Sequence, residues 1–281
     1  MSDKVLVTGS TGQIGTEVVK ELIARGASVK AASRQGVEVP GAEATVFSFE
    51  QSESFGPALE GVDRVFLLVP AQSIPDANRL VPPFVEAMKA AGIRKVVCMT
   101  GMLSDSPDAP LKGTEQAVKD SGIPYAILRP NWFDQNFAPG YYLDMIKGAG
   151  GVFLPAADGK VSFVDTRDIG AVAAAALTED GHDGGEYALT GPDAIDHTQA
   201  CAILSEASGR EIRYAPISED DYRAALTSEG MPEAGIEGMI DLYRLIRDGL
   251  CDEVSGDVAS VLGRPPISFE QYAKDHAALL S

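Results

Sequence analysis

Three glycines near the start of the chain have a spacing that suits phosphate binding. Gly9, Gly12 and Gly15 follow the apolar run 4–8, and the amphipathic segment 13–25 overlaps the last of them. In a strand–turn–helix unit, such glycines permit a sharp turn, let backbone N–H groups approach a phosphate, and let the helix pack on the strand. The helix N-terminus adds partial positive charge. This pattern predicts a turn that holds a dinucleotide pyrophosphate, with contacts from Gly9, Thr11, Gly12, Gln13 and Ile14.

The end of the next apolar run indicates which dinucleotide is bound. A carboxylate at this place would bind the ribose 2′-hydroxyl of NAD, but the chain has Ser33 followed by Arg34. Ser33 can hydrogen bond to a 2′-phosphate, and Arg34 can pair with that phosphate or stack on the adenine. We therefore expect NADP(H) to be preferred, with NAD(H) as a possible ligand. The alternative is that Arg34 is an ordinary solvated loop residue.

The predicted fold is a Rossmann-like, doubly wound α/β fold. Short apolar runs alternate with longer amphipathic segments, which is typical of a parallel sheet covered by helices on both faces. The expected strands are 4–8, 28–32, 44–47, 64–68, 95–99 and 124–128, and the expected helices are 13–25, 54–59, 76–91 and 111–121.

Beyond residue 130 the rhythm changes, and a smaller, mostly helical substrate lobe is expected. Strands are predicted at 161–164 and 186–189, and helices at 165–177, 197–207, 219–226, 234–247 and 268–280. We assign 1–130 to the cofactor domain, with 150–190 returning to its sheet, and 131–149 with 191–281 to the substrate lobe.

Further cofactor contacts are predicted where later strands end, because ligands of open parallel sheets bind at the carboxyl ends of the strands. Phe49 and Glu50 would border the adenine, and Val69 with Pro70 would lie near a ribose. Pro130 and Asn131 follow the sixth strand, and the Asn131 amide would hydrogen bond to the nicotinamide carboxamide or to the substrate.

The composition argues against several other classes of protein. Acidic residues outnumber basic ones 41 to 23, a formal net charge of −18, which disfavours nucleic acid and anionic membranes as partners. The 3 cysteines and 3 histidines show no metal-ligand spacing, so no metal is expected. Scattered cysteines, no apolar run long enough to span a membrane and no signal peptide together predict a cytoplasmic protein.

Four segments together resemble one known family. They are 7–15 (VTGSTGQIG), 121–133 (SGIPYAILRPNWF), 163–170 (FVDTRDIG) and 187–192 (YALTGP). On these motifs the chain resembles the NmrA-like group of atypical short-chain dehydrogenase/reductases, in particular type-2 NADPH:quinone oxidoreductases, triphenylmethane reductases and NAD(P)H azoreductases. The resemblance covers nearly the whole chain and implies an NAD(P)H-dependent oxidoreductase.

The chain departs from the family in its proton donor. Ordinary short-chain dehydrogenases use a Tyr-x-x-x-Lys pair, and alignment on Glu115 puts these two positions at Pro107 and Leu111, neither of which can transfer a proton. Many quinone-reductase-like members have a histidine where Leu111 stands. The resemblance therefore implies hydride delivery to a quinone or other conjugated aromatic acceptor that needs no proton from this pair.

The acceptor would be held in an aromatic pocket. Trp132 is its leading candidate because it follows the sixth strand, and the other expected substrate contacts are Met102, Phe133, Asn136, Phe137, Tyr141, Tyr142 and Tyr243. Each aromatic residue could equally be plain core. Thr100 ends the fifth strand, where the family's catalytic serine or threonine lies, and is the candidate catalytic residue for polarising a substrate oxygen.

Two other functions remain open. One is a tailoring reductase or oxygenation enzyme that acts on an aromatic polyketide in natural-product biosynthesis. The other is a non-catalytic regulator that senses NADP(H), because the NmrA-like family includes regulators that bind a dinucleotide without turnover. The expected oligomeric state is a monomer or a homodimer.

Overall fold

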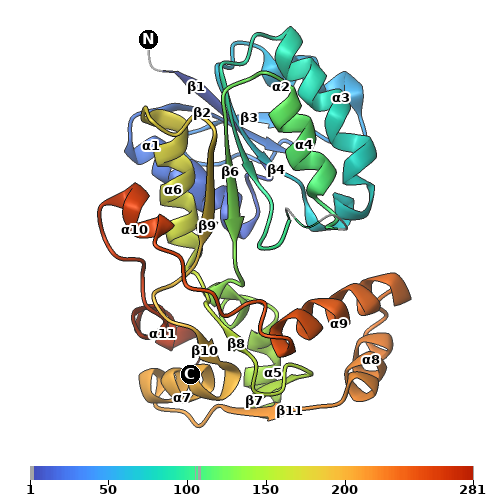
Figure 1. Ribbon diagram of the computed structural model, residues 1–281, viewed down its shortest axis with the longest axis vertical. Coiled ribbons are helices and arrows are strands. Elements are labelled where there is room, and N and C mark those ends of the chain that lie inside the picture. The colour runs from blue at the N-terminus through green and yellow to red at the C-terminus, as the bar shows by residue number, and fades with distance from the viewer. Residues whose placement is uncertain (1–2, 105, 107–108, 281) are drawn as a thin grey trace. The chain divides into compact units, whose positions relative to one another are not determined.

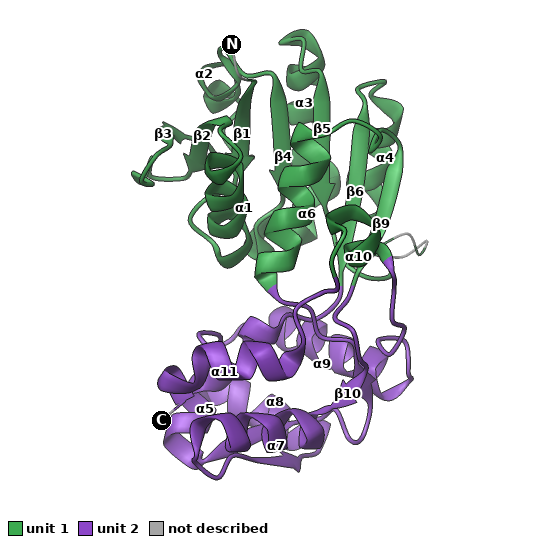
Figure 2. Ribbon diagram, turned by 90° about the vertical axis from the view of Figure 1, so that its left-hand side faces the viewer, with its two compact units in different colours: residues 1–130, 166–189, 257–264 green, residues 131–165, 190–256, 265–281 purple. Residues whose placement is uncertain are grey.

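The computed structural model describes residues 3–104, 106 and 109–280. The chain forms two compact units, coloured separately in Figure 2. Unit 1 contains Met1–Pro130, Thr166–Leu189 and Asp257–Arg264, and unit 2 contains Asn131–Asp165, Thr190–Gly256 and Pro265–Ser281.

Unit 1 is built on a 7-stranded sheet with the order β3-β2-β1-β4-β5-β6-β9. All neighbouring strands run parallel. The inner strands consist of apolar, often β-branched residues that are almost entirely buried, as a sheet covered on both faces requires. The strands are β1 (Lys4–Thr8), β2 (Ser28–Ser33), β3 (Glu43–Val46), β4 (Arg64–Leu68), β5 (Lys95–Met99), β6 (Tyr125–Pro130) and β9 (Gly185–Leu189).

Helices cover both faces of this sheet (Figure 1). One face carries α1 (Gln13–Ala24) and α6 (Thr166–Thr178), and the other carries α2 (Phe55–Leu59), α3 (Ala77–Ala90) and α4 (Lys112–Asp120). The short 3₁₀ helices η1 (Ser52–Ser54) and η2 (Ala71–Asp76) precede α2 and α3. A further helix, α10 (Asp257–Leu262), packs beside β9 and α6. This arrangement confirms the predicted doubly wound α/β fold.

The packing of α1 against α6 depends on small residues. Ala173–Ala176 are all buried on α6, and a Cβ atom on Gly170 would lie 2.8 Å from the Glu17 Cβ of α1. Because alanine and glycine leave room for the neighbouring backbone, the two helices can lie close together. They hold the first strand–turn–helix unit against the sheet.

Unit 2 is mostly helical and has its own apolar core. Its helices are η3 (Asp134–Asn136), α5 (Tyr142–Ala149), α7 (His197–Ser208), α8 (Glu219–Ser228), α9 (Glu233–Arg247) and α11 (Phe269–Leu280). Two small sheets complete it: a parallel pair of β7 (Gly151–Leu154) with β11 (Arg213–Pro216), and an antiparallel pair of β8 (Lys160–Val161) with β10 (Ile195–Asp196).

The sequence-based domain boundaries differ from these units at two places. Residues 150–165, expected to return to the large sheet, belong to unit 2 because β7 and β8 pair with β11 and β10 of that unit. Residues 257–264, expected in the substrate lobe, belong to unit 1 because α10 packs against β9 and α6. Among the described residues, no helix combines the length and apolar character needed to cross a membrane.

Candidate cofactor and acceptor sites

The predicted cofactor residues of unit 1 follow the carboxyl ends of its parallel strands. Gly9 follows β1, Arg34 follows β2 and Val69 follows β4. The strand order reverses between β1 and β4, and open α/β sheets bind ligands at such a switch point. The topology therefore brings these residues to the sheet edge where a dinucleotide would lie.

The glycine turn after β1 has little room for side chains. Gly9 has a φ of +67°, which residues with a Cβ atom rarely adopt. The Gly12 amide donates a hydrogen bond of 3.0 Å to the Gly9 carbonyl oxygen, and this bond closes the turn. A Cβ atom on Gly15 would lie 2.1 Å from the same oxygen. Gly15 thus allows α1 to begin directly against the turn.

The start of α1 leaves its amide groups open to a ligand. Gly12 is the N-cap residue, no side chain caps the helix, and the first turn carries no acidic residue. Thr11, Gly12 and Gln13 are exposed. The first N–H groups of a helix have no intrahelical partner, and here they can donate to phosphate oxygens in the field of the helix dipole. This geometry fits a pyrophosphate.

The Ser33–Arg34 pair provides two donors beside the turn. The Val37 amide donates to the Ser33 Oγ at 2.9 Å, so the hydroxyl proton of Ser33 can still be donated to a ligand. Arg34 is exposed, and the residues that the structure describes offer it no hydrogen bond or ion pair. Its guanidinium group is therefore available for an anion such as a 2′-phosphate.

The other predicted cofactor positions differ in accessibility. Phe49 is buried in the core of unit 1, edge-on to Phe47 with ring centres 4.9 Å apart. Val69 is buried in the same core, whereas Glu50 is exposed and Pro70 is half-buried. Cofactor contact by Phe49 and Val69 would therefore use backbone or ring-edge atoms.

A polar network with buried Thr100 and Glu115 at its centre links the carboxyl ends of β5 and β6. We call its members Thr100, Glu115, Lys119, Arg129 and Glu186 the strand-end network. The Thr100 Oγ1 donates to Glu115 Oε1 at 2.8 Å, and Arg129 donates to both Glu115 oxygens at 2.9 and 2.6 Å. Arg129 and Lys119 also pair with Glu186 at 2.6 and 2.7 Å.

The charges of this network reinforce one another. Hydrogen bonds to Glu115, together with those to Glu186, raise the pKa of Arg129. Burial raises the pKa of Glu186, but hydrogen bonds from Lys119 and Arg129 outweigh it, and the net pKa is lowered. Because the Thr100 proton is directed at Glu115, the catalytic role predicted for Thr100 would require this bond to break.

The position of the missing proton donor is apolar. Leu111 is buried in the core of unit 1, as expected for a side chain with no polar group, and Pro107 lies outside the described residues. The described part of the chain also contains no cluster of His, Cys, Asp or Glu that could hold a metal ion.

Asn131 and Trp132 open unit 2 and are tied to its interior. The Asn131 Nδ2 donates to Ser162 Oγ at 2.7 Å and to the Cys251 carbonyl oxygen at 2.8 Å. Its Oδ1 accepts a hydrogen bond from the Trp132 amide at 2.9 Å. Because the nitrogen and the oxygen of its amide both form hydrogen bonds within the protein, Asn131 fixes the backbone next to Trp132. The contact of Asn131 with a carboxamide remains a prediction.

Four tyrosines form a cluster in unit 2, and one of them, Tyr243, packs against Trp132. This tyrosine cluster consists of Tyr141, Tyr142, Tyr222 and Tyr243. The hydroxyls of Tyr142 and Tyr243 are 2.9 Å apart, and the Tyr141 hydroxyl donates to that of Tyr142 at 3.4 Å. The Tyr243 ring lies 5.3 Å from the Trp132 ring and also 5.3 Å from the Tyr222 ring.

The cluster is buried except at one end. Tyr142 and Tyr243 are fully buried, whereas Tyr141 is 47% exposed. Burial raises the pKa of Tyr142 and of Tyr243 well above the ordinary tyrosine value, and it raises the pKa of Tyr222 to about 12. The four phenols are therefore neutral near pH 7 and are able to donate protons in hydrogen bonds.

The remaining predicted acceptor residues fall into two groups. Phe137 is fully buried in the core of unit 2, and Asn136 is buried in η3. Trp132, Phe133 and Met102 are half-buried. Trp132, Phe133 and Tyr141 thus have exposed surface in unit 2, whereas Phe137 mainly supports the core.

Sequence reasoning missed several members of these groups. Arg129 was not recognised as the partner of Glu115 and Glu186, and Tyr222 was not placed with Tyr243. Arg129 directly precedes Pro130, and a charged residue at the end of a buried strand is a usable signal. No local pattern brings Tyr222 of α8 to Tyr243 of α9, because that contact depends on how the two helices pack.

Comparison with known proteins places the chain in a family. A model of the NmrA-like family matches residues 1–273. The chain is 35% identical to NAD(P)H azoreductase of Xenophilus azovorans over 98% of both chains. It is 30% identical to quinone oxidoreductase 2 of Escherichia coli over 93% of this chain and 94% of the relative.

A solved structure extends this likeness to three dimensions. The crystal structure of the NADPH-dependent quinone oxidoreductase of Escherichia coli complexed with NADPH superposes with a TM-score of 0.84 at 26% identity. The alignment covers 96% of this chain and 99% of the other. The motifs, the sheet and both sequence relatives agree, and the chain belongs to the NmrA-like family.

Proposed function

We propose that the protein is an NADP(H)-dependent oxidoreductase that reduces quinones or other conjugated aromatic acceptors. The observation that carries the proposal is the glycine turn with an uncapped helix start, next to Ser33 and to Arg34, which forms no ion pair with any described residue. These groups match a pyrophosphate and a 2′-phosphate. The azoreductase and quinone oxidoreductase relatives support the same cofactor and the same kind of acceptor.

Different residues would bind the cofactor and the aromatic acceptor. The turn 9–15 and Arg34 hold the phosphates, and the exposed surface of Trp132, Phe133 and Tyr141 receives a flat aromatic ring. The bound nicotinamide supplies the hydride. The protein acts by holding donor and acceptor together and by excluding water, which removes the entropic cost of their encounter from the reaction step.

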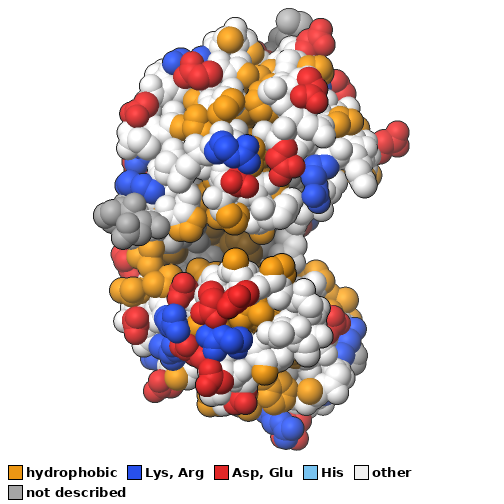
Figure 3. Space-filling model, turned by 90° about the vertical axis from the view of Figure 1, so that its right-hand side faces the viewer, with side chains coloured by type: hydrophobic (Ala, Val, Ile, Leu, Met, Phe, Trp, Pro, Cys, Tyr) orange, Lys and Arg blue, Asp and Glu red, His pale blue; other side chains and the backbone are white. Residues whose placement is uncertain are grey.

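The cysteines bear on the cellular compartment of the protein. All three cysteines are free and buried, which fits a reducing compartment such as the cytoplasm. Lys and Arg side chains lie interspersed with Asp and Glu on the face drawn in Figure 3. We propose a cytoplasmic protein that works as a monomer or homodimer.

The direct test is NADPH oxidation by the purified protein with a panel of quinones, azo dyes and triarylmethane dyes. We expect turnover with at least one acceptor and tighter binding of NADPH than of NADH, measured by nicotinamide fluorescence. Tight NADPH binding without turnover on the whole panel would contradict the proposal and favour the regulator. Equal affinity for both cofactors would contradict the role of Arg34.

A further inference from the structure

The proposed reaction leaves one chemical requirement unmet. Hydride addition to a neutral quinone breaks a C–H bond of the reduced cofactor and produces a hydroquinone monoanion, which needs one proton. The position at which many quinone-reductase-like members have a histidine is occupied by Leu111, which is buried and apolar. Another group near the acceptor would therefore have to supply the proton, or solvent would do so.

Among the tyrosines of the cluster, Tyr141 has the geometry of such a donor. Its side chain is 47% exposed, whereas Tyr142 and Tyr243 are fully buried. Their hydroxyls form a chain, with 3.4 Å between Tyr141 and Tyr142 and 2.9 Å between Tyr142 and Tyr243. The chain thus begins at a partly exposed side chain, whose hydroxyl proton is directed at Tyr142, and ends at a buried one.

Burial leaves the net pKa of Tyr141 raised, but the buried hydroxyls can stabilise its ionised form once the proton has left. When Tyr141 loses its proton, Tyr142 can turn to donate to the phenolate, and Tyr243 can donate to Tyr142 in turn. Hydrogen bonds to a charged oxygen are about twice as strong as those between neutral groups, and chained bonds reinforce one another. Burial raises the pKa of Tyr141, while its hydrogen bonds with Tyr142 and Tyr243 lower it.

The cluster is also connected to the strand end at which the acceptor is expected. The Tyr243 ring packs on Trp132 at 5.3 Å, and Trp132 lies two residues after β6 ends at Pro130. An acceptor that contacts the exposed surfaces of both Trp132 and Tyr141 would lie beside the tyrosine cluster. This connection lies within unit 2 and along the chain.

We propose that Tyr141 is the proton donor for neutral acceptors and that Tyr142 and Tyr243 stabilise the phenolate it leaves. The Tyr141 O–H bond breaks as a new O–H bond forms on the hydroquinone oxygen, and solvent returns a proton to the exposed Tyr141. Tyr141 is then a catalytic residue, and Tyr142 and Tyr243 are positioning residues. The inference rests on the proposed function.

The test compares two acceptors that differ in their need for a proton. A neutral naphthoquinone needs one, whereas a cationic triarylmethane dye becomes neutral on taking hydride and needs none. In single-turnover experiments with NADPH, Tyr141→Phe should slow quinone reduction about 100-fold, the usual contribution of a general acid. It should slow dye reduction far less, because phenylalanine keeps the ring that contacts the dye, and it should abolish the solvent deuterium isotope effect seen with the quinone.

Two further variants separate proton donation from packing. Tyr142→Phe should slow quinone reduction less than Tyr141→Phe does and should have little effect on dye reduction. Loss of packing alone would instead slow both reactions. Tyr187→Phe removes a hydroxyl that bonds to His182 in unit 1 at 2.8 Å and serves as the matched control with both rates unchanged.

The possible failures can be told apart. If Tyr141→Phe slows both acceptors equally, or neither, Tyr141 is not the donor and the inference is overturned while the proposed function stands. If the wild-type protein reduces neither acceptor, the proposed function fails and the inference fails with it.

Discussion

The strand-end network of unit 1 and the tyrosine cluster of unit 2 bury polar groups in opposite ways. In unit 1, Glu115 and Arg129 are charged and form two hydrogen bonds with each other. In unit 2, Tyr142 and Tyr243 are neutral and share a single hydrogen bond. One region holds fixed charges, and the other holds protons that can move.

This difference corresponds to two chemical tasks. A buried, two-point ion pair fixes the ends of β5 and β6 rigidly, because removing either partner leaves an unpaired charge. Neutral phenols tolerate an uncharged aromatic acceptor and cost less to bury. We infer that the cofactor side of the protein is built for fixed geometry and the acceptor side for adaptable contact.

The largest expected effect comes from breaking the ion pair of unit 1. Glu115→Gln should lower the free energy of unfolding by about 3 kcal/mol, because it leaves the Arg129 charge without its main partner. Urea unfolding monitored by circular dichroism would measure it, with Glu60→Gln at an exposed site as the control. A loss no larger than that of the control would show that the network does not fix the strand ends.

The next effect is a loss of stability in acid that we expect from His197, a buried residue close to the tyrosine cluster. His197 is fully buried among Phe137, Phe163 and Tyr214, and the described residues offer neither of its ring nitrogens a partner. Burial lowers the pKa of His197 to about 4. Between about pH 6.5 and pH 4, His197 is therefore protonated in the unfolded chain but neutral in the folded protein.

The sign follows from this difference in proton binding. The folded protein should lose stability as the pH falls from about 6.5 to 4, by about 3 kcal/mol in total, and His197 should contribute nothing above that window. Urea unfolding from pH 7 to pH 4 would show a flatter pH dependence for His197→Phe than for the wild type. Parallel curves would mean that His197 is not the group responsible.

A third effect tests Arg34, a cation of unit 1 to which the described part of the chain offers no hydrogen bond or ion pair. Arg34→Ala should weaken NADPH binding by about 1–3 kcal/mol, as for a lost charge-assisted contact, and should leave NADH binding unchanged. Isothermal titration would measure both affinities, with Arg79→Ala on α3 as the control. Equal weakening for both cofactors would reduce Arg34 to an adenine-stacking residue.

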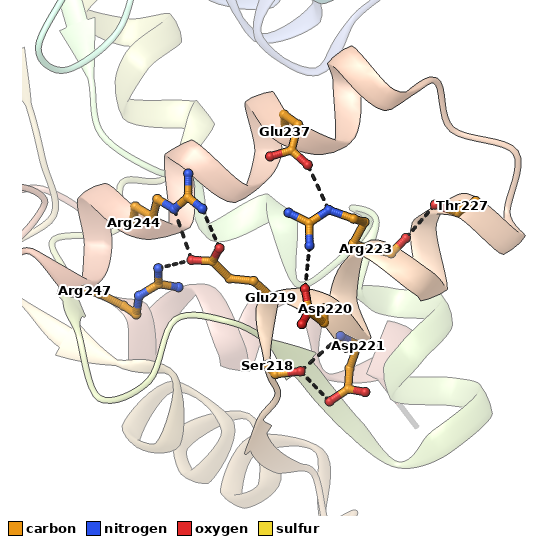
Figure 4. Close-up of polar contacts among 9 residues, drawn as sticks. All are labelled: Ser218, Glu219, Asp220, Asp221, Arg223, Thr227, Glu237, Arg244 and Arg247. Carbon is orange, nitrogen blue, oxygen red and sulfur yellow. Dashed lines mark hydrogen bonds and ion pairs between the residues drawn. The ribbon is translucent and has the colours of Figure 1, made fainter.

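The smallest expected effect on stability comes from the ion pairs of Glu219, which are more exposed than the buried pair of Glu115. Figure 4 shows Glu219 of α8 between Arg244 and Arg247 of α9, with a Glu219–Arg244 separation of 2.5 Å. Hydrogen bonds from Arg244 and Arg247 lower the pKa of Glu219 to about 2. Because the group is exposed, water and salt screen most of this interaction.

The expected outcome for Glu219→Gln is a slight fall in melting temperature at neutral pH and low salt. A lowered carboxyl pKa gives stability that is present above the unfolded value and lost as the pH falls toward 2, so the difference should vanish in acid. It should also shrink in 1 M salt. A large, salt-independent fall would mean that α8 and α9 depend on this pair as unit 1 depends on Glu115.

The sequence predicted unit 1 far better than unit 2. β1, β4 and β5 have the bounds expected of them, because each is a continuous apolar run closed by polar residues. In unit 2 the strand expected at 161–164 is reduced to β8, and β7, β10, β11 and α5 were missed; α10 of unit 1 was missed as well. These elements are short, and their pairing partners lie far along the chain, so no local period reveals them.

The two candidate sites differ in the same way. The glycine turn is a local feature whose geometry follows from residues 9–15, and its chemistry could be read directly. Tyr142 and Tyr243 are separated by 101 positions, and their contact is decided by how α5 and α9 pack. Aromatic composition predicted a pocket, but it could not predict a chain of hydroxyls.

The division of the chain has a consequence for how such proteins diversify. The backbone passes from one unit to the other after residues 130, 165, 189, 256 and 264, so neither unit is a single continuous stretch. A gene fragment that encodes all of unit 2 and nothing else cannot be cut out and exchanged in one recombination event. Exchanging unit 2 would need several crossovers, whereas a substitution within unit 2 needs none and leaves the cofactor unit intact.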